Sequence, residues 1–432
     1  MAATHFSSIP GPHAPQGAQR VRPFNYRRFV DWTFALFILS GMIAIVEPSP
    51  YDLVSLFTIP LWFIGGFRIS RALIPFFALV FTYNLGGFIS LIPWWNEPDP
   101  TLFMYQSLYL AITAVFFAMY FGEHTQERGE LCLKAFTLST LICAVLGIIG
   151  YFDLGGLGEY FSKYGRASGT FKDPNVFGSY LVMGGLYLVH NIVLGRTRHL
   201  LLSLLMLLVI SAGVLLSFSR GSWGAFVIGI VLTVGLARAT AETSAMRWRI
   251  TWMTMLAVGL AVLGLMALLS VDSTREFFIQ RAAVTQDYDG GETGRFGNQL
   301  RSLPMLLDRP NGFGPLHFRL IFDLEPHNSY INSFASYGWL GGFSFFLLVG
   351  ITTFVGFRLC FLRTPFQQLA QVFWPSLLVF LIQGFQIDID HWRHVYLMLG
   401  AVWGLEGARF LWLARLAQAA RGTVARVASI SS

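Results

Sequence analysis

Apolar residues gather along the chain into long runs that are separated by short polar segments. The runs are roughly 17–23 residues long, which is the length a helix needs to cross a hydrocarbon core of about 30 Å. Helices are expected because a lipid-exposed backbone must satisfy its own hydrogen bonds, and because the alternating pattern of barrel strands is absent. The pattern predicts about twelve transmembrane helices, near residues 30–46, 52–67, 72–93, 102–122, 131–151, 174–194, 199–217, 222–238, 248–270, 336–358, 365–384 and 392–415.

The composition supports this all-α, polytopic membrane class. Of the 432 residues, 54% are hydrophobic and only 12% are charged, whereas soluble chains carry about 25% charged residues. The mean hydropathy is +0.57. These values exclude a soluble enzyme, a disordered chain and a nucleic-acid-binding domain, despite the net charge of +7. The lipid bilayer is therefore the first partner that we expect.

The basic residues predict the orientation of the helices. Nineteen of the 30 Lys and Arg residues fall in one alternate set of connections, which also contains both chain ends. The positive-inside rule places this set, and both termini, in the cytoplasm. No signal peptide is expected before the first helix. We divide the chain into a disordered cytoplasmic tail at 1–29, nine helices within 30–270, a long outer loop at 271–335, three helices within 336–415, and a cytoplasmic tail at 416–432.

The eleven remaining basic residues lie on the outer side, and they concentrate in segment 152–173 and in the long outer loop. In the first of these places, Asp173-Pro174-Asn175 has the form of a helix cap followed by Pro in the first turn. A helix N-terminus beside Arg166 and Lys172 would offer backbone N–H groups and positive charge to an anion. The alternative is an ordinary turn and cap with basic side chains at the interface.

Arg220 stands alone between two apolar runs, within SFSRGSW. A charge at the membrane boundary is costly and is often functional. Its guanidinium could bind a phosphate or carboxylate with two parallel hydrogen bonds. The alternative is an interfacial anchor in a short turn.

The outer loop carries further candidates. Arg295 and Arg301 precede a segment rich in Pro and Gly, and His327 stands just before the tenth predicted helix. An imidazole could take a hydroxyl proton near neutral pH, with Asp323 and Glu325 available to orient it. The alternative is a solvated loop histidine.

Two acidic clusters are weaker candidates for a cation site. Asp287, Asp289 and Glu292 have the spacing of a hard-cation loop, although a plain polar turn fits better. The second cluster precedes the last helix, and a hydrated interfacial loop is favoured there over a metal site; it comprises Asp388, Asp390, His391 and His394. The three cysteines show no zinc or redox spacing. We therefore predict no metal and no cofactor.

Four motifs between residues 150 and 345 occur in the order seen in one protein family: GRASGTFKDPNVFGSYL, SFSRGSWGAF, GR followed by PNGFG, and PHNSYINSFASYGWLGG. In these motifs the chain resembles the O-antigen ligase and polymerase superfamily of bacterial inner-membrane transferases. The resemblance implies a GT-C-like fold and a metal-independent, inverting transfer. The implied donor is a glycan on undecaprenyl diphosphate, and the implied acceptor is a hydroxyl of a glycan or of the lipid A-core.

The resemblance also implies roles for individual residues. Arg220 and an arginine of the long loop would grip the diphosphate, and Arg295 is the expected loop arginine, with Arg281 and Arg301 as alternatives. His327, next to Asn328, corresponds to the family histidine, and Arg166 to the basic position of the first motif. The implied site faces the periplasm.

Three hypotheses remain for the function. The first is a glycan ligase or polymerase, between which the sequence does not choose. The second is a transporter or flippase of anionic or lipid-linked solutes, because twelve helices and a basic outer vestibule also suit that class. The third makes the transferase metal-dependent through Asp287 and Asp289.

Overall fold

The computed structural model describes residues 25–67, 69–270, 275, 291 and 294–430. A long helix lies at each of the twelve predicted positions, with boundaries that differ by several residues. These helices are α1 (Tyr26–Ser40), α2 (Pro50–Ile64), α3 (Ile74–Leu91), α4 (Pro98–Phe121), α5 (Thr125–Tyr151), α7 (Pro174–Leu194), α8 (Leu200–Leu216), α9 (Arg220–Ala239), α10 (Ser244–Leu269), α15 (Gly338–Phe361), α16 (Gln367–Gln383) and α17 (Arg393–Ile430).

Seven helices in the described part of the chain are long and apolar enough to cross a membrane. The chain is therefore a mainly helical protein with the features of an all-α membrane protein. That all twelve helices cross the bilayer, and that the fold is GT-C-like, stay predictions. The last helix continues to Ile430, beyond the predicted boundary at residue 415.

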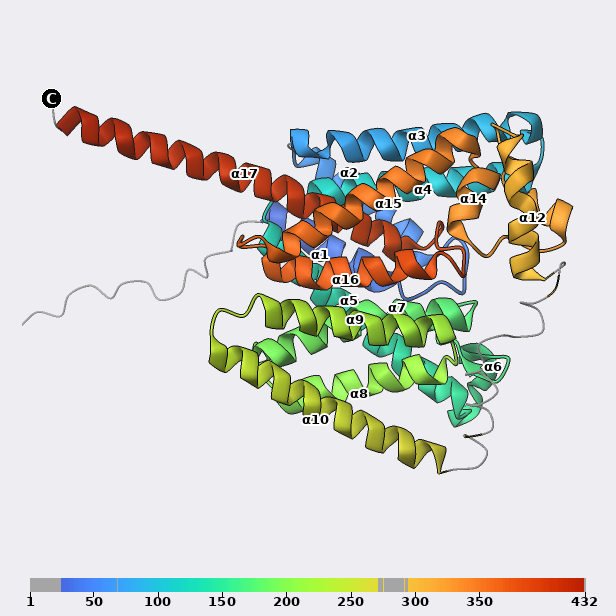
Figure 1. Cartoon of the computed structure of the whole chain (residues 1–432), viewed down its shortest axis with the longest axis horizontal. Coiled ribbons are helices and arrows are strands. Elements are labelled where there is room, and N and C mark those ends of the chain that lie inside the picture. The colour runs from blue at the N-terminus through green and yellow to red at the C-terminus, as the bar shows by residue number, and fades with distance from the viewer. Residues whose placement is uncertain (1–24, 68, 271–274, 276–290, 292–293, 431–432) are drawn as a thin grey trace, which may run out of the picture.

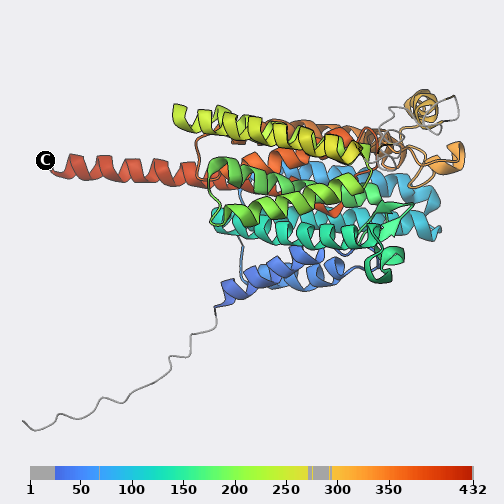
Figure 2. The same cartoon turned by 90° about the horizontal axis from the view of Figure 1, so that it is seen from below.

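The long helices run in roughly one direction, and successive helices alternate in sense (Figure 1). The shorter elements α6 (Gly158–Phe161), α12 (Arg295–Leu307) and α14 (Ser329–Ala335) lie together at one end of the bundle, which we call the α14 end. The last turns of α17 project from the opposite end in both views (Figure 2). The α14 end also holds a short antiparallel hairpin within segment 152–173. Its strands, β1 (Ser162–Lys163) and β2 (Arg166–Ala167), have two residues each.

Aromatic side chains of α1 pack against those of α4. Phe34, Phe37, Phe117 and Tyr120 are fully buried, and Phe34 stacks on Tyr120 with a ring separation of 4.1 Å. The outer faces are also apolar, as at Leu201, which is 83% exposed. Large exposed apolar surfaces of this kind are costly in water and fit a lipid environment.

Helix caps position the chain at the α14 end. Asp173 is the N-cap of α7 and Pro174 follows it, which confirms the predicted helix start. Ser219 caps α9, so Arg220 is the first residue of that helix. Gly178 lets α7 lie close to the turn before α9, because a Cβ there would be 2.5 Å from Ser217 Oγ.

The described part of the outer loop packs against the ends of the long helices. Residues from α12, α13 (Phe318–Phe322) and α14 share a small apolar cluster that includes Phe313. Trp94 anchors it, because its indole N–H donates to the Phe313 carbonyl over 3.1 Å and its ring stacks on His317 at 4.0 Å. This part of the outer loop is therefore fixed to the helical bundle rather than folded separately.

Candidate active site

Five of the predicted site residues line one cavity of about 340 Å³ at the α14 end: Arg166, Asn175, Arg220, Arg295 and His327. They come from separate parts of the chain, since the hairpin and α7 contribute two of them and α9, α12 and the segment before α14 contribute one each. We call this the arginine cavity. The fold thus brings together residues up to 161 positions apart in sequence.

Arg166 is buried, and hydrogen bonds to neighbouring segments hold it in place. Its Nε donates to the Ser217 carbonyl over 2.7 Å, and its Nη2 donates to Asn175 Oδ1 over 2.8 Å. These bonds join the hairpin to the turn before α9 and to the first turn of α7. The guanidinium is therefore set in place by the fold before any ligand binds.

Arg220 and Arg295 each stand at the start of a helix, α9 and α12. Both side chains are half-buried. Arg295 Nη1 donates to the Gln386 carbonyl over 3.2 Å, and its guanidinium lies 4.7 Å from the centre of the Phe296 ring. With Arg166, they give the cavity three guanidinium groups, which together can stabilise a multiply charged anion.

His327 lies on the wall of the arginine cavity, in a turn that requires a left-handed backbone (φ +45°). The carboxylate of Asp388 holds this turn, because it accepts from the backbone N–H groups of His327 (3.1 Å) and Asn328 (2.9 Å). His327 Nδ1 lies 3.6 Å from Asp388 Oδ2. The imidazole is thus positioned by a residue 61 positions further along the chain.

The electrostatic surroundings favour a neutral imidazole at His327. Partial burial lowers its pKa, and the nearby charge of Arg295 lowers it further, whereas Asp173 raises it to a smaller extent. A neutral imidazole is the form that can accept a proton. Burial also raises the pKa of Asp388, and the carboxylates of Asp390 and Glu325 add to that effect.

The expectation that Asp323 or Glu325 orients His327 is not met by the geometry. Glu325 forms an ion pair with Arg319 at 3.6 Å, and Asp388 provides the contacts to His327 instead. Sequence reasoning had singled out Asp388 only as part of an acidic cluster. No local spacing pattern links two segments that meet through tertiary packing.

Three other predicted binding residues do not line the arginine cavity. Lys172 forms an ion pair with Glu47. The guanidinium of Arg301 lies 5.6 Å from the centre of the Phe322 ring. Asn328 caps α14, where its side chain accepts from the backbone N–H groups at positions 330 and 331. Arg281 lies outside the described residues.

The segment before α17 is less hydrated than the sequence suggested. Asp390 and His394 are both buried, and Asp390 accepts a hydrogen bond of 2.9 Å from Asn332 Nδ2. The interpretation of a hydrated loop is therefore wrong for these two residues. Within the described ranges, no group of three His, Cys, Asp or Glu residues is placed to hold a metal ion. The acidic positions 287, 289 and 292 lie outside those ranges.

Comparison with known proteins links this site to a family. Residues 204–346 match the model of the O-antigen ligase family. The matched stretch contains Arg220, Arg295 and His327, and it confirms the resemblance found in the sequence motifs. The match covers about a third of the chain, which over this stretch is similar to the O-antigen ligase family, and the apolar helices fit a membrane protein. No curated protein matches the chain.

Proposed function

We propose that the protein transfers a glycan from undecaprenyl diphosphate to a sugar hydroxyl, in the manner of an O-antigen ligase or a surface-polysaccharide polymerase. The observation that carries this proposal is the arginine cavity, where three arginines and one histidine from distant segments meet. The family match over residues 204–346 supports the same reaction class. The reaction takes place at the periplasmic face of the inner membrane.

In this reaction Arg220 and Arg295 bind the diphosphate, and Arg166 with Asn175 completes the anion site. As the bond between the anomeric carbon and the phosphate oxygen breaks, the electron pair stays on the diphosphate. Guanidinium groups that are already in place stabilise this growing charge, and losing one such donor typically costs about 10²–10³ in rate. The diphosphate stores the driving energy, so no nucleotide is required.

His327 acts as the general base. It removes the proton from the acceptor hydroxyl while that oxygen forms a bond to the anomeric carbon, on the face opposite the departing diphosphate. This geometry inverts the configuration at the anomeric carbon. The lowered pKa of His327 keeps the imidazole neutral at physiological pH, and general-base catalysis contributes roughly 10²–10⁴ in rate.

The test is transfer by purified protein that is supplied with the lipid-linked donor and the acceptor. His327→Ala should reduce transfer by about 10²–10⁴ because the base is lost. His199→Ala is the matched control, since His199 is exposed and lies at the opposite end of the bundle. Product analysis by gel and mass spectrometry measures both variants.

Near-normal product from the His327 variant would reject this residue as the base. Transport of a labelled donor into liposomes without any transfer would instead support the transporter hypothesis. Activity that survives a strong chelator is expected, and complete loss on chelation would favour the metal-dependent hypothesis.

A further inference from the structure

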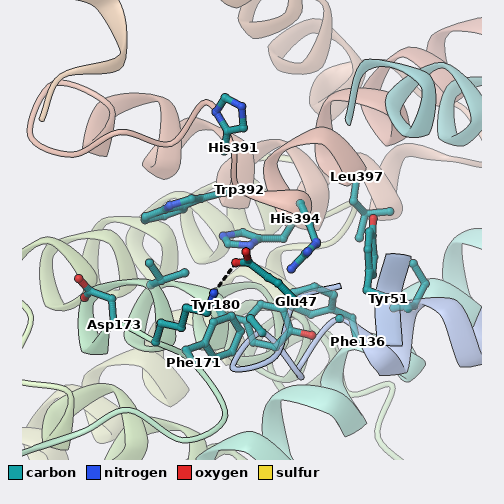
Figure 3. A pocket seen from close by; sticks show the side chains of 16 residues that line it. Glu47, Tyr51, Phe136, Phe171, Asp173, Tyr180, His391, Trp392, His394 and Leu397 are labelled. Carbon is teal, nitrogen blue, oxygen red and sulfur yellow. Dashed lines mark hydrogen bonds and ion pairs between the residues drawn. The ribbon is translucent and has the colours of Figure 1, made fainter. Parts of the chain in front are cut away.

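Figure 3 shows the side chains that line a second cavity, whose volume is about 190 Å³. Elements α1, α2, α5, α7 and α17 and the segments before α2 and α7 line it. Asp173 lines both cavities, so they meet at the N-cap of α7. A group bound in the second cavity would therefore lie next to the reacting centre.

Two residues that line this cavity each carry a buried polar atom with no hydrogen-bond partner among the described residues: Tyr51 Oη and His394 Nε2. Tyr51 is 4% exposed and His394 is 6% exposed. A buried polar atom without a partner costs roughly 1–3 kcal/mol. Such atoms are rare in folded proteins. Two residues of this cavity wall thus carry hydrogen-bonding atoms that no described residue satisfies.

The remaining wall is largely aromatic. Phe171, Tyr180 and Trp392 are all buried and line the cavity, and the His394 ring lies 5.2 Å from the Trp392 ring. Aromatic walls with a few fixed polar groups are typical of small-molecule sites. The volume of about 190 Å³ exceeds that of the cavity of about 150 Å³ that admits a benzene ring in another protein, so the cavity has room for a small cyclic group.

The cations of Lys172 and Arg393, which line this cavity, are paired with carboxylates. Lys172 pairs with Glu47, and Arg393 donates to the Asp52 carboxylate over 2.8 Å. A site whose cations are already paired offers little to a phosphate. It suits a neutral polyhydroxylated group instead.

We propose that the second cavity is a saccharide subsite in which Tyr51 Oη and His394 Nε2 bind sugar hydroxyls of one of the two glycan substrates. This inference rests on the proposed glycan transfer, and it adds a binding site away from the arginines. The sugar belongs either to the acceptor or to the donor glycan. In both cases the chemistry recognised is a single pyranose ring.

The test uses the full-length protein and measures KM separately for the lipid-linked donor and for the acceptor. Tyr51→Phe and His394→Phe keep the aromatic packing but remove the hydrogen-bonding atom. Each should raise KM for one substrate about three- to tenfold, the effect of one hydrogen bond, with kcat unchanged because ground-state binding is lost. The melting temperature should not fall with Tyr51→Phe, because that change removes an unpaired buried hydroxyl.

Tyr83→Phe serves as the control, since Tyr83 is another buried tyrosine and lines neither cavity. An increase in the acceptor KM places the acceptor sugar in the subsite, and an increase in the donor KM places the donor glycan there. If the wild type transfers glycan and both KM values stay unchanged in both variants, the subsite is rejected while the proposed function stands. If the wild type transfers no glycan, the proposed function itself fails.

Discussion

The cationic side chains of the arginine cavity are tied to the protein before substrate arrives. Arg166 donates to the Ser217 carbonyl and Arg295 to the Gln386 carbonyl. These bonds use some of the N–H donors of each guanidinium group, but they fix the positions of the positive charges. Fixed charges need no reorganisation in the transition state, which is the main source of electrostatic catalysis.

Arg295 also sets the proton affinity of His327, and this effect predicts a pH dependence. The acidic limb of the kcat/KM profile should lie at a lower pH than for an ordinary histidine, because burial and Arg295 lower the pKa of His327. As pH falls through that pKa, the imidazole gains a proton and the base is lost. Arg295→Gln removes a positive charge, so the pKa of His327 rises and the limb shifts to higher pH.

The measurement is the pH profile of the residual activity of Arg295→Gln. Arg301→Gln is the control, since Arg301 does not line the cavity and its loss should leave the limb in place. A limb that stays unmoved in Arg295→Gln, or that moves with Arg301→Gln, would contradict this assignment of the loop arginine.

At the scale of elements, the arginine cavity depends on the close packing of α7 against the start of α9. Ser222 Oγ donates to the Asn175 carbonyl over 3.1 Å and lies 3.0 Å from Ser179 Oγ. Gln383 Nε2 of α16 donates to Ser179 Oγ over 2.9 Å. This network of polar groups ties three helices together directly beneath the cavity.

Gly178 permits this packing, so its replacement predicts a combined loss of stability and activity. In Gly178→Ala the new Cβ would lie 2.5 Å from Ser217 Oγ and 2.8 Å from Ser222 Oγ. Overpacking of this kind costs about 1–3 kcal/mol, and it displaces Asn175 and Arg220. We expect a lower melting temperature in detergent and a reduced transfer rate.

Gly235→Ala is the matched control within α9, because no atom lies within 4 Å of its added Cβ. Alanine favours a helix over glycine by about 1 kcal/mol, so the melting temperature should hold or rise. Equal melting temperatures for the two variants would show that the contact at Gly178 is unimportant.

At the scale of the whole molecule, successive helices alternate in direction, so their connections fall alternately at the two ends of the bundle. These two ends differ in their chemistry. The arginine cavity and the second cavity lie at the α14 end, whereas the connections rich in Lys and Arg lie at the other end. From the positive-inside rule we expect the α14 end to face the periplasm. A lipid-borne diphosphate would then reach the arginines at the membrane boundary.

Cysteine labelling tests this orientation. The native cysteines Cys132, Cys143 and Cys360 are buried, so the wild type should react little with a membrane-impermeant maleimide. Tyr164→Cys, at a position that is 83% exposed at the α14 end, should be labelled in cells whose outer membrane alone is permeabilised. His199→Cys should react only after the inner membrane is opened. The reverse pattern would place the cavity in the cytoplasm and overturn the proposed reaction.

The sequence by itself determined the helical architecture and the start of α7. Hydropathy is a local property, so twelve helices could be placed from it, and the Asp173 cap was recognisable from three adjacent residues. The motifs also supplied Arg220 and His327 as candidates. That these residues share one cavity is consistent with the order of the predicted helices, but order alone does not require it.

Only the tertiary structure decided which distant side chains meet. It brought Asp388, rather than Glu325, to the turn at His327, and it placed Arg295 but not Arg301 in the arginine cavity. It also enclosed Tyr51 and His394, which no motif had joined, in a second cavity. These outcomes depend on side-chain packing between helices far apart in the chain, and a pattern with a range of a few residues carries no information about that packing.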